Sequence, residues 1–222
     1  MDKKTIASMI DHTLLKPEAT PAQIEKLCAE AAEYHFASVC VNPVYIPLAA
    51  RLLKGTGVKV CCVVGFPLGA IAPEQKAAEA ASCAAMGAEE LDMVIHVGAA
   101  KAGDWALVQR DIEGVVKAAA GHTVKVIIET CLLTDEEKEK MCDIVCEAGA
   151  DYIKTSTGFS TAGANFHDVE LMVKGVHGRC KVKAAGGIST VEDMEKFLAL
   201  GADRLGTSRA VKLLNGEQAK GY

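Results

Sequence analysis

The chain has 222 residues, of which half are apolar and only 5% are aromatic, and its formal net charge is −5. Such a composition predicts a core of Val, Ile, Leu and Ala, as in parallel sheets that are covered by helices. The acidic balance excludes a nucleic-acid polymer as a partner. The longest apolar run, Cys61–Ala72, is too short and too broken by Gly and Pro to span a membrane.

Short β-rich runs alternate with amphipathic helical runs along the whole chain. In chain order, the predicted strands are Met9–Thr13, Ser38–Val41, Lys59–Val64, Leu91–Ile95, Val124–Glu129, Tyr152–Thr155, Lys181–Ala184 and Arg204–Gly206. The predicted helices between them are Pro21–Tyr34, Pro43–Leu53, Pro73–Met86, Asp104–Ala119, Asp135–Glu147, Asn165–Val176 and Val191–Leu200. Several of these helices begin after a favourable N-cap, such as Thr20 or Thr134.

The same junction recurs between a predicted helix and the strand that follows it. The segments MGAEELDMV, AGADYIKTS and LGADRLGTS each end a helix at glycine and enter a strand within a few residues. These short returns indicate parallel pairing. Eight such units predict one closed (β/α)8 barrel, because an open sheet would leave edge strands that no Lys or Pro protects here. We therefore expect a single catalytic domain over residues 1–222, with 216–222 as a flexible C-terminal tail.

The N-terminus and the cysteines indicate the cellular compartment. Asp11 and His12 interrupt the apolar part of MDKKTIASMIDHT, so this stretch does not have the pattern of a signal peptide. The nine cysteines form no Cys-x-x-Cys pair, and most of them, such as Cys40 and Cys62, lie in apolar stretches. We interpret them as reduced core thiols of a cytoplasmic protein that uses no metal.

Two lysines lie in neighbouring predicted strands. Lys154 follows Tyr152 and Ile153, whose side chains predict a dry interior, and Lys183 lies late in the next strand. Because neighbouring strands are ~4.8 Å apart, the two amines would lie close together. Burial and mutual repulsion would then favour a neutral amine, the form that attacks carbonyl carbon. Two alternatives stay open: the head of Lys154 reaches water, or Lys181, on the same strand face as Lys183, is its partner.

Carboxylates also occur in or beside apolar strands. Asp92, within ELDMVIHVG, is interpreted as a proton carrier beside the lysines, although an ion pair that fixes a loop would also explain it. Asp11, within MIDHTLLKP, is placed at the mouth of the first strand as an orienting or water-holding residue. Glu129 ends the fifth predicted strand and is a further candidate, whereas His12 and His96 are interpreted as structural groups.

Glycine and hydroxyl residues gather at the ends of three neighbouring strands: Thr157 and Gly158, then Gly186 and Gly187, then Gly206, Thr207 and Ser208. Glycine lets backbone N–H groups approach an anion closely. The loops after the seventh and eighth strands are also the usual phosphate site of (β/α)8 barrels. We therefore expect the ligand to be a small phosphorylated carbonyl compound.

Together these motifs resemble the deoxyribose-phosphate aldolases, a family of class I aldolases that act through a Schiff base. The resemblance covers essentially the whole chain, in the segments IDHTLLKP, SVCVNP, VVGFPLGA, ELDMVI, ETCLLTDEE, IKTSTGF, KAAGGI, RLGTS and a terminal GY. It implies reversible cleavage of 2-deoxy-D-ribose 5-phosphate to acetaldehyde and D-glyceraldehyde 3-phosphate, in deoxynucleoside breakdown. It also implies that no cofactor is needed, because the lysine supplies the electron sink, and it suggests a homodimer.

Matching the motifs residue by residue gives each candidate a role. By resemblance, Lys154 is the imine-forming lysine, Lys183 is the neighbour that tunes it, and Asp92 is the proton donor and acceptor. Asp11 and Cys40 match residues that line the family's pocket. The terminal Tyr222 matches a tyrosine that reaches back into the site, where its phenol would shuttle a proton to the enamine carbon.

One position departs from part of the family, and two other functions stay open. Phe159 stands where some members carry a lysine that helps to bind phosphate, so phosphate binding would rest on backbone amides, Thr157, Ser208 and Arg209. An isomerase on the same barrel would use a carboxylate base instead of a lysine. A non-catalytic sugar-phosphate-binding barrel would keep the glycine loops but would not need Lys154.

Overall fold

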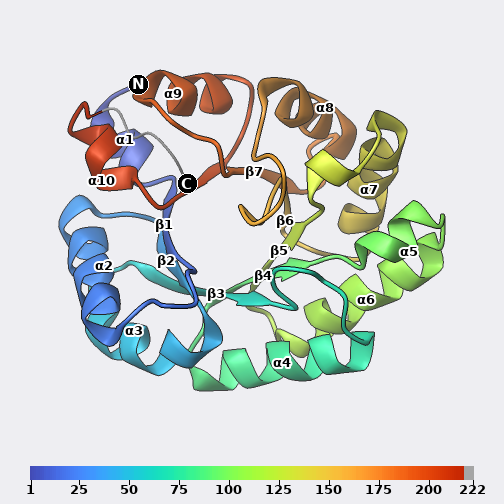
Figure 1. Cartoon of the computed structure of the whole chain (residues 1–222), viewed down its shortest axis with the longest axis horizontal. Helices are drawn as coiled ribbons and strands as arrows, with labels where there is room; N and C mark the ends of the chain where they lie inside the picture. Colours follow the sequence, from blue (N-terminus) through green and yellow to red (C-terminus); the bar gives the residue numbers. More distant parts are fainter. Residues whose placement is uncertain (218–222) are drawn as a thin grey trace.

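Eight parallel strands close into a barrel in chain order, and β1 pairs with both β2 and β8. The computed structural model describes residues 1–217, and Figure 1 shows the strands in the middle with the helices arranged around them. The strands are β1 (Ile10–Leu14), β2 (Ser38–Val41), β3 (Lys59–Val64), β4 (Glu90–Val94), β5 (Thr123–Ile127), β6 (Tyr152–Lys154), β7 (Lys181–Ala185) and β8 (Arg204–Thr207). The predicted (β/α)8 barrel is confirmed.

The helices cover the outside of the barrel. They are α1 (Lys3–Ala7), α2 (Pro21–Tyr34), α3 (Ile46–Leu53), α4 (Pro73–Met86), α5 (Val97–Lys101), α6 (Trp105–Ala118), α7 (Asp135–Glu147), α8 (Phe166–Val176), α9 (Val191–Ala199) and α10 (Ala210–Leu214), with 3-10 turns η1 (Pro43–Tyr45) and η2 (Thr130–Leu132). All seven helical regions predicted from the sequence are helical. The sequence pattern did not reveal α1 and α5, because five residues are too few to show a helical period.

Two predicted elements differ from the observed ones by more than one residue, for identifiable reasons. The expected helix Pro43–Leu53 is divided into η1 and α3, and Pro47 in the first turn of α3 has no N–H with which to continue a preceding helix. The fifth strand ends at Ile127, two residues before its expected end. Glu129 has a left-handed backbone with φ 54°, which turns the chain away from the sheet.

The apolar core lies between the strands and the helices, whereas the inside of the barrel is charged. Outward-facing strand residues such as Val39, Leu91 and Ile153 belong to the main apolar cluster together with helix residues. Inside the barrel, Lys125 and Lys183 are among the largest fully buried side chains of the described chain. Because strand side chains alternate between two faces, each strand contributes to both environments.

The strand register sets the height of the inward side chains. Lys154 and Lys183 are direct partners across β6 and β7, and Asp92 and Lys125 are direct partners across β4 and β5. Neighbouring partners that face the same side of a sheet lie side by side. The register therefore brings residues that are far apart in sequence into one layer. Among residues 1–217, no helix combines the length and the apolarity that crossing a bilayer requires.

Candidate active site

A layer of seven charged side chains fills the barrel interior. They come from six strands: Asp11 from β1, Glu90 and Asp92 from β4, Lys125 from β5, Lys154 from β6, Lys183 from β7 and Arg204 from β8. With all seven ionised, four cations face three carboxylates, so the layer carries one excess positive charge. Charges this deeply buried persist only when they are paired.

Asp92 is the carboxylate that joins the two predicted lysines. Its Oδ2 atom lies 2.7 Å from Nζ of Lys154 and 2.7 Å from Nζ of Lys183. The structure therefore brings together Lys154, Lys183 and Asp92, the three predicted catalytic residues that lie within the described chain. Lys181, the alternative partner of Lys154, is exposed at the start of β7, and its ammonium lies over the ring of Tyr152 at 5.5 Å from the centroid.

Lys183 is held as an ammonium. Burial by itself lowers the pKa of Lys183, but the carboxylates of Asp11 and Asp92 outweigh burial and raise this pKa above its ordinary value. The distance from Nζ to Asp11 Oδ2 is 2.5 Å. The sequence argument needs a second ammonium beside Lys154, and the two carboxylates, which that argument did not include, favour this charge state of Lys183.

Asp92 and Asp11 are held as carboxylates. Burial raises the pKa of Asp92, but Lys125, Lys154 and Lys183 together lower it well below its ordinary range. The pKa of Asp11 is also lowered: Lys183, Lys125 and Arg204 outweigh the opposing effect of its burial.

Asp11 lies deeper than the sequence predicted. It is fully buried rather than at the mouth of the barrel, and its Oδ1 accepts hydrogen bonds from Ser38 Oγ at 2.6 Å and Arg204 at 2.6 Å. Because it follows Ile10 at the start of β1, it belongs to the lower part of the strand. Its predicted contact with substrate stays a prediction.

Sequence reasoning missed three members of the charged layer. Lys125 lies in the apolar strand TVKVI, which is the same signal that drew attention to Lys154. Glu90 and Arg204 each begin a strand, where a charged residue is common and gives no signal of an interior position. The interior position of these three residues became visible only with the closed register of the barrel.

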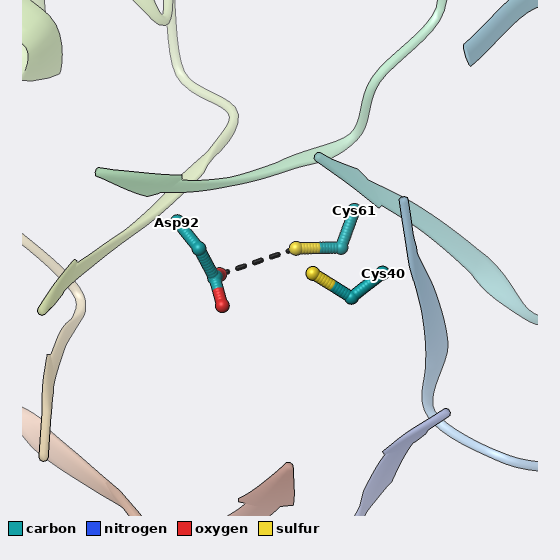
Figure 2. Close-up of side chains that lie close together, drawn as sticks. All are labelled: Cys40, Cys61 and Asp92. Atoms are coloured by element: carbon teal, nitrogen blue, oxygen red, sulfur yellow. Dashed lines mark hydrogen bonds between the residues drawn. The ribbon is translucent and has the colours of Figure 1, made fainter. Parts of the chain in front are cut away.

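Cys40 and Cys61 lie beside Asp92, as Figure 2 shows. Cys61 donates a hydrogen bond from Sγ to Asp92 Oδ1 at 3.1 Å, and Cys40 is the strand partner of Cys61. One ligand atom from each of these three residues lies within 4.8 Å of the others. However, ammonium groups already occupy both oxygens of Asp92, so a metal cation would have to displace one of them. The predicted role of Cys40 in substrate binding stays a prediction.

A pocket of about 430 Å³ opens above the charged layer. Its lining includes every residue that the sequence assigned to the phosphate site: Thr157, Gly158, Gly186, Gly187, Gly206, Thr207 and Ser208. Lys154 also lines the pocket, whereas the side chains of Lys125 and Lys183 are 0% and 1% exposed. Lys16 and Arg209 add positive charge to the lining, and the sequence had not suggested Lys16.

Hydrogen bonds fix the loop after β6. The carboxylate of Glu129 accepts from the backbone N–H of Thr157 at 3.2 Å and from its hydroxyl at 2.5 Å. The same hydroxyl oxygen accepts from the N–H of Phe159 at 3.0 Å. The Phe159 ring is half exposed and meets Phe66 edge to face at 5.2 Å. Glu129 thus holds the pocket wall from below.

Gly187 and Gly206 line the pocket for different structural reasons. Gly187 has φ +74°, a conformation that side chains disfavour, and its nearest neighbour would be the carbonyl oxygen of Ala164 at 3.4 Å. Gly206 has an ordinary backbone, but an added Cβ would lie 3.1 Å from Cε of Lys183. Gly206 therefore leaves room for Lys183 as well as lining the pocket. Tyr222 lies outside the described residues.

Known aldolases match this chain along nearly its whole length. The model of the DeoC/LacD family aldolases matches residues 5–214. The deoxyribose-phosphate aldolase of Clostridium perfringens strain SM101 is 55% identical over 218 residues, covering 98% of this chain and 97% of the relative. That of Geobacillus sp. strain WCH70 is 56% identical, with 98% of each chain covered.

Solved structures of deoxyribose-phosphate aldolases also match this chain. A putative deoxyribose-phosphate aldolase from Coccidioides immitis matches with a TM-score of 0.94 at 44% identity, covering 97% of this chain and 87% of the other. A deoxyribose phosphate aldolase from Aeropyrum pernix, described as a tetramer, matches with a TM-score of 0.91 at 38% identity, covering 97% and 92%.

Proposed function

This chain belongs to the DeoC/LacD family of aldolases, and we propose that it is a deoxyribose-phosphate aldolase whose Schiff base forms on Lys154. The reaction is the reversible cleavage of 2-deoxy-D-ribose 5-phosphate to acetaldehyde and D-glyceraldehyde 3-phosphate. One observation supports this assignment best: the Lys154 amine lies at the base of the glycine-lined pocket and is bonded to the Asp92 carboxylate.

The charge count of the buried layer favours a reactive amine at Lys154. When Lys154 gives up its proton, three cations face three carboxylates and the layer becomes neutral. Lys183 keeps its proton because Asp11 and Asp92 raise its pKa. The neutral amine of Lys154 can then attack the C1 aldehyde of the open-chain sugar, and loss of water from the carbinolamine gives an iminium.

The iminium has the same charge as the protonated lysine that it replaces, so the Asp92 carboxylate stabilises both. It withdraws electrons from the C2–C3 bond, which breaks as the C3 hydroxyl loses its proton, releasing D-glyceraldehyde 3-phosphate and leaving an enamine. Protonation of the enamine at C2 and hydrolysis release acetaldehyde. Asp92 accepts protons and the Lys183 ammonium supplies them. Asp92 Oδ2 contacts both amines, so it links Lys183 to the Lys154 nitrogen.

The phosphate of the substrate binds in the upper part of the pocket. The backbone N–H of Gly187 and the hydroxyl of Ser208 offer donors there, whereas the N–H of Gly186 already donates to the Gly206 carbonyl. Lys16 adds a positive charge. Phe159 gives the opposite wall an apolar surface where some family members carry a lysine.

Trapping with borohydride tests the proposed function. In the presence of acetaldehyde, reduction should leave a two-carbon adduct on the peptide that contains Ile153–Ser156, and the Lys154→Met variant should show none. The Lys181→Met variant, altered at the exposed start of β7, serves as the matched control and should be labelled like the wild type. Labelling of Lys183 or Lys125 would reverse the assignment. An isomerase or a non-catalytic binding protein would give no adduct.

The remaining parts of the proposal concern location and assembly. We place the enzyme in the cytoplasm, acting on small-molecule sugar phosphates and aldehydes. We propose a homodimer on the basis of the family resemblance. Light scattering of the purified protein at several concentrations tests the assembly, and a stable monomer or tetramer would contradict it.

A further inference from the structure

Lys125 is a buried cation that the proposed mechanism does not use. Its side chain is fully buried below the pocket, so it does not reach the substrate. Its ammonium lies 2.8 Å from Asp92 Oδ1, 2.6 Å from Glu90 Oε2 and 3.4 Å from Cys61 Sγ. The ammonium therefore donates hydrogen bonds to Asp92 and Cys61 and forms an ion pair with Glu90.

The contacts of Asp92 are divided between its two oxygens. Oδ2 faces the ammonium groups of Lys154 and Lys183, while Oδ1 is bound by Lys125 and by the Cys61 thiol visible in Figure 2. We propose that Lys125 is a positioning residue for the aldol reaction: it holds Asp92 through Oδ1 so that Oδ2 stays between Lys154 and Lys183. This inference rests on the proposed function, because it assigns Lys125 a task only if Lys154 forms the imine.

Lys125 is itself fixed from below. Glu90 comes from the same strand as Asp92, two residues earlier, so both carboxylates face the same ammonium. Arg204 holds Glu90 from β8 at 3.2 Å, and it also binds Asp11. A chain of paired charges therefore runs from Arg204 through Glu90 and Lys125 to Asp92. Such a chain restricts the rotation of the Asp92 carboxylate, which the Cys61 thiol alone would restrain weakly.

Lys125 also contributes to the proton affinity of the layer. The titratable and charged groups around Asp92 are Asp11, Cys40, Cys61, Lys125, Lys154 and Lys183, with Glu90 and Arg204 paired to Lys125 and Asp11 in the same layer. Removing one cation from this set makes the layer bind its remaining protons more tightly. The acid limb of the kcat/KM profile, which reports deprotonation of the free enzyme's essential groups, should therefore move to higher pH.

The Lys125→Met variant tests both consequences. The KM for 2-deoxy-D-ribose 5-phosphate should change little, because Lys125 does not line the pocket. We expect kcat to fall by about 10- to 100-fold, the usual effect of a misplaced catalytic group. The acid limb should move up by about 1 to 3 pH units. Exchange of the acetaldehyde methyl protons with solvent should slow more than imine trapping on Lys154.

A second variant separates charge from position and guards against loss of folding. Lys125→Met combined with Glu90→Gln restores the charge count, so the acid limb should return toward that of the wild type. The low kcat should persist, because Asp92 Oδ1 still lacks its ammonium. Circular dichroism and thermal melting establish that each variant is folded before kinetics are compared, and Lys181→Met is the matched lysine control.

The outcomes distinguish this inference from the proposed function. If the wild type traps acetaldehyde on Lys154 but both Lys125 variants keep kcat within about twofold and an unchanged pH profile, Lys125 has no positioning role. If kcat falls without any change in the pH profile or in the ratio of exchange to trapping, Lys125 serves only the fold. If the wild type traps no acetaldehyde, the proposed function itself fails.

Discussion

The charge on a barrel lysine depends on the carboxylates that it contacts. Lys183 contacts both Asp11 and Asp92, which raise its pKa despite complete burial. Lys154 donates to one oxygen of Asp92 and shares that oxygen with Lys183. Apolar surroundings in the sequence predicted that both lysines are buried, and the structure confirms their burial. Their partners come from β1 and β4, and no local pattern could show that these carboxylates would keep Lys183 charged.

Substitution of Gly187 should weaken phosphate binding selectively. In Gly187→Ala, the methyl group must adopt a left-handed backbone with φ +74° at the pocket wall, which displaces the local N–H groups. We expect the KM for 2-deoxy-D-ribose 5-phosphate to rise about tenfold, equivalent to roughly 1.4 kcal/mol of binding energy. Borohydride trapping of unphosphorylated acetaldehyde should continue at the wild-type rate. Equal loss of both activities would mean that Gly187 serves the fold.

Substitution of Gly206 should have a different result. The added Cβ of Gly206→Ala would lie 3.1 Å from Cε of Lys183 and 3.0 Å from Cβ of Ala185. The Lys183 stem must then shift, and the Asp92 contact shifts with it. We expect imine trapping with acetaldehyde to slow together with cleavage of the sugar phosphate, by about tenfold or more. Normal trapping combined with a raised KM would instead place Gly206 in phosphate binding alone.

The secondary-structure elements were largely predictable because each one carries its own signal. Helices such as α2, α4 and α7 have the bounds that the sequence predicted, since a cap residue precedes each apolar period or a glycine ends it. The interior contacts of the strands were less predictable. Lys125 and Arg204 share an acceptor, Glu90, although they come from β5 and β8, and only the closed register places them together.

The buried pair of Lys76 in α4 and Asp111 in α6 should be unfavourable at neutral pH, relative to an apolar pair in the same place. Lys76 of α4 is fully buried and donates to the Val94 carbonyl at the end of β4 and to Asp111 of α6 at 2.5 Å. Burial lowers the pKa of Lys76 and raises that of Asp111, so both groups are shifted toward their neutral forms. Within the described chain, the second carboxylate oxygen of Asp111 has no hydrogen-bond partner.

Replacing one member of this pair should lower the free energy of unfolding much more than replacing both. Lys76→Met alone leaves a buried carboxylate without its partner, and the free energy of unfolding should fall by about 3 to 5 kcal/mol. Lys76→Met combined with Asp111→Leu should recover most of that loss, because apolar pairs of similar volume often match a buried ion pair. Urea unfolding measures both variants. A double variant as unstable as the single one would show that Lys76 acts mainly through Val94.

For the whole molecule, the unusual feature is an ionic layer inside a barrel whose apolar core lies outside it. Most of the apolar surface is buried between the sheet and the helices, so the apolar core of the fold lies outside the barrel. The interior can therefore carry charges for chemistry. The sequence predicted the architecture because eight strand–helix units repeat. It predicted the pocket because barrel chemistry lies at the strand ends. It did not predict how the layer below the pocket balances its charges.

The pH dependence of stability should reflect that layer. Asp11 and Asp92 have folded-state pKa values below their ordinary value of 3.8, so their stabilisation is present above that pH and is lost as the pH falls below it. Lys125 and Lys183 have pKa values above their ordinary value of 10.5, so their stabilisation is present below that pH and is lost only at higher pH. These four groups therefore favour folding throughout the interval between those two values.

We expect the melting temperature to stay nearly constant from about pH 5 to 9 and to fall steeply below about pH 4. In Asp92→Asn one of the responsible carboxylates is absent, so the difference in melting temperature between pH 7 and pH 3 should shrink. In Glu170→Gln, which removes an exposed partner of Lys174, that difference should match the wild type. Differential scanning calorimetry across the pH range measures all three proteins. A wild-type protein that loses most of its stability between pH 7 and pH 5, or an Asp92→Asn variant with the wild-type profile, would show that groups outside the barrel control acid unfolding.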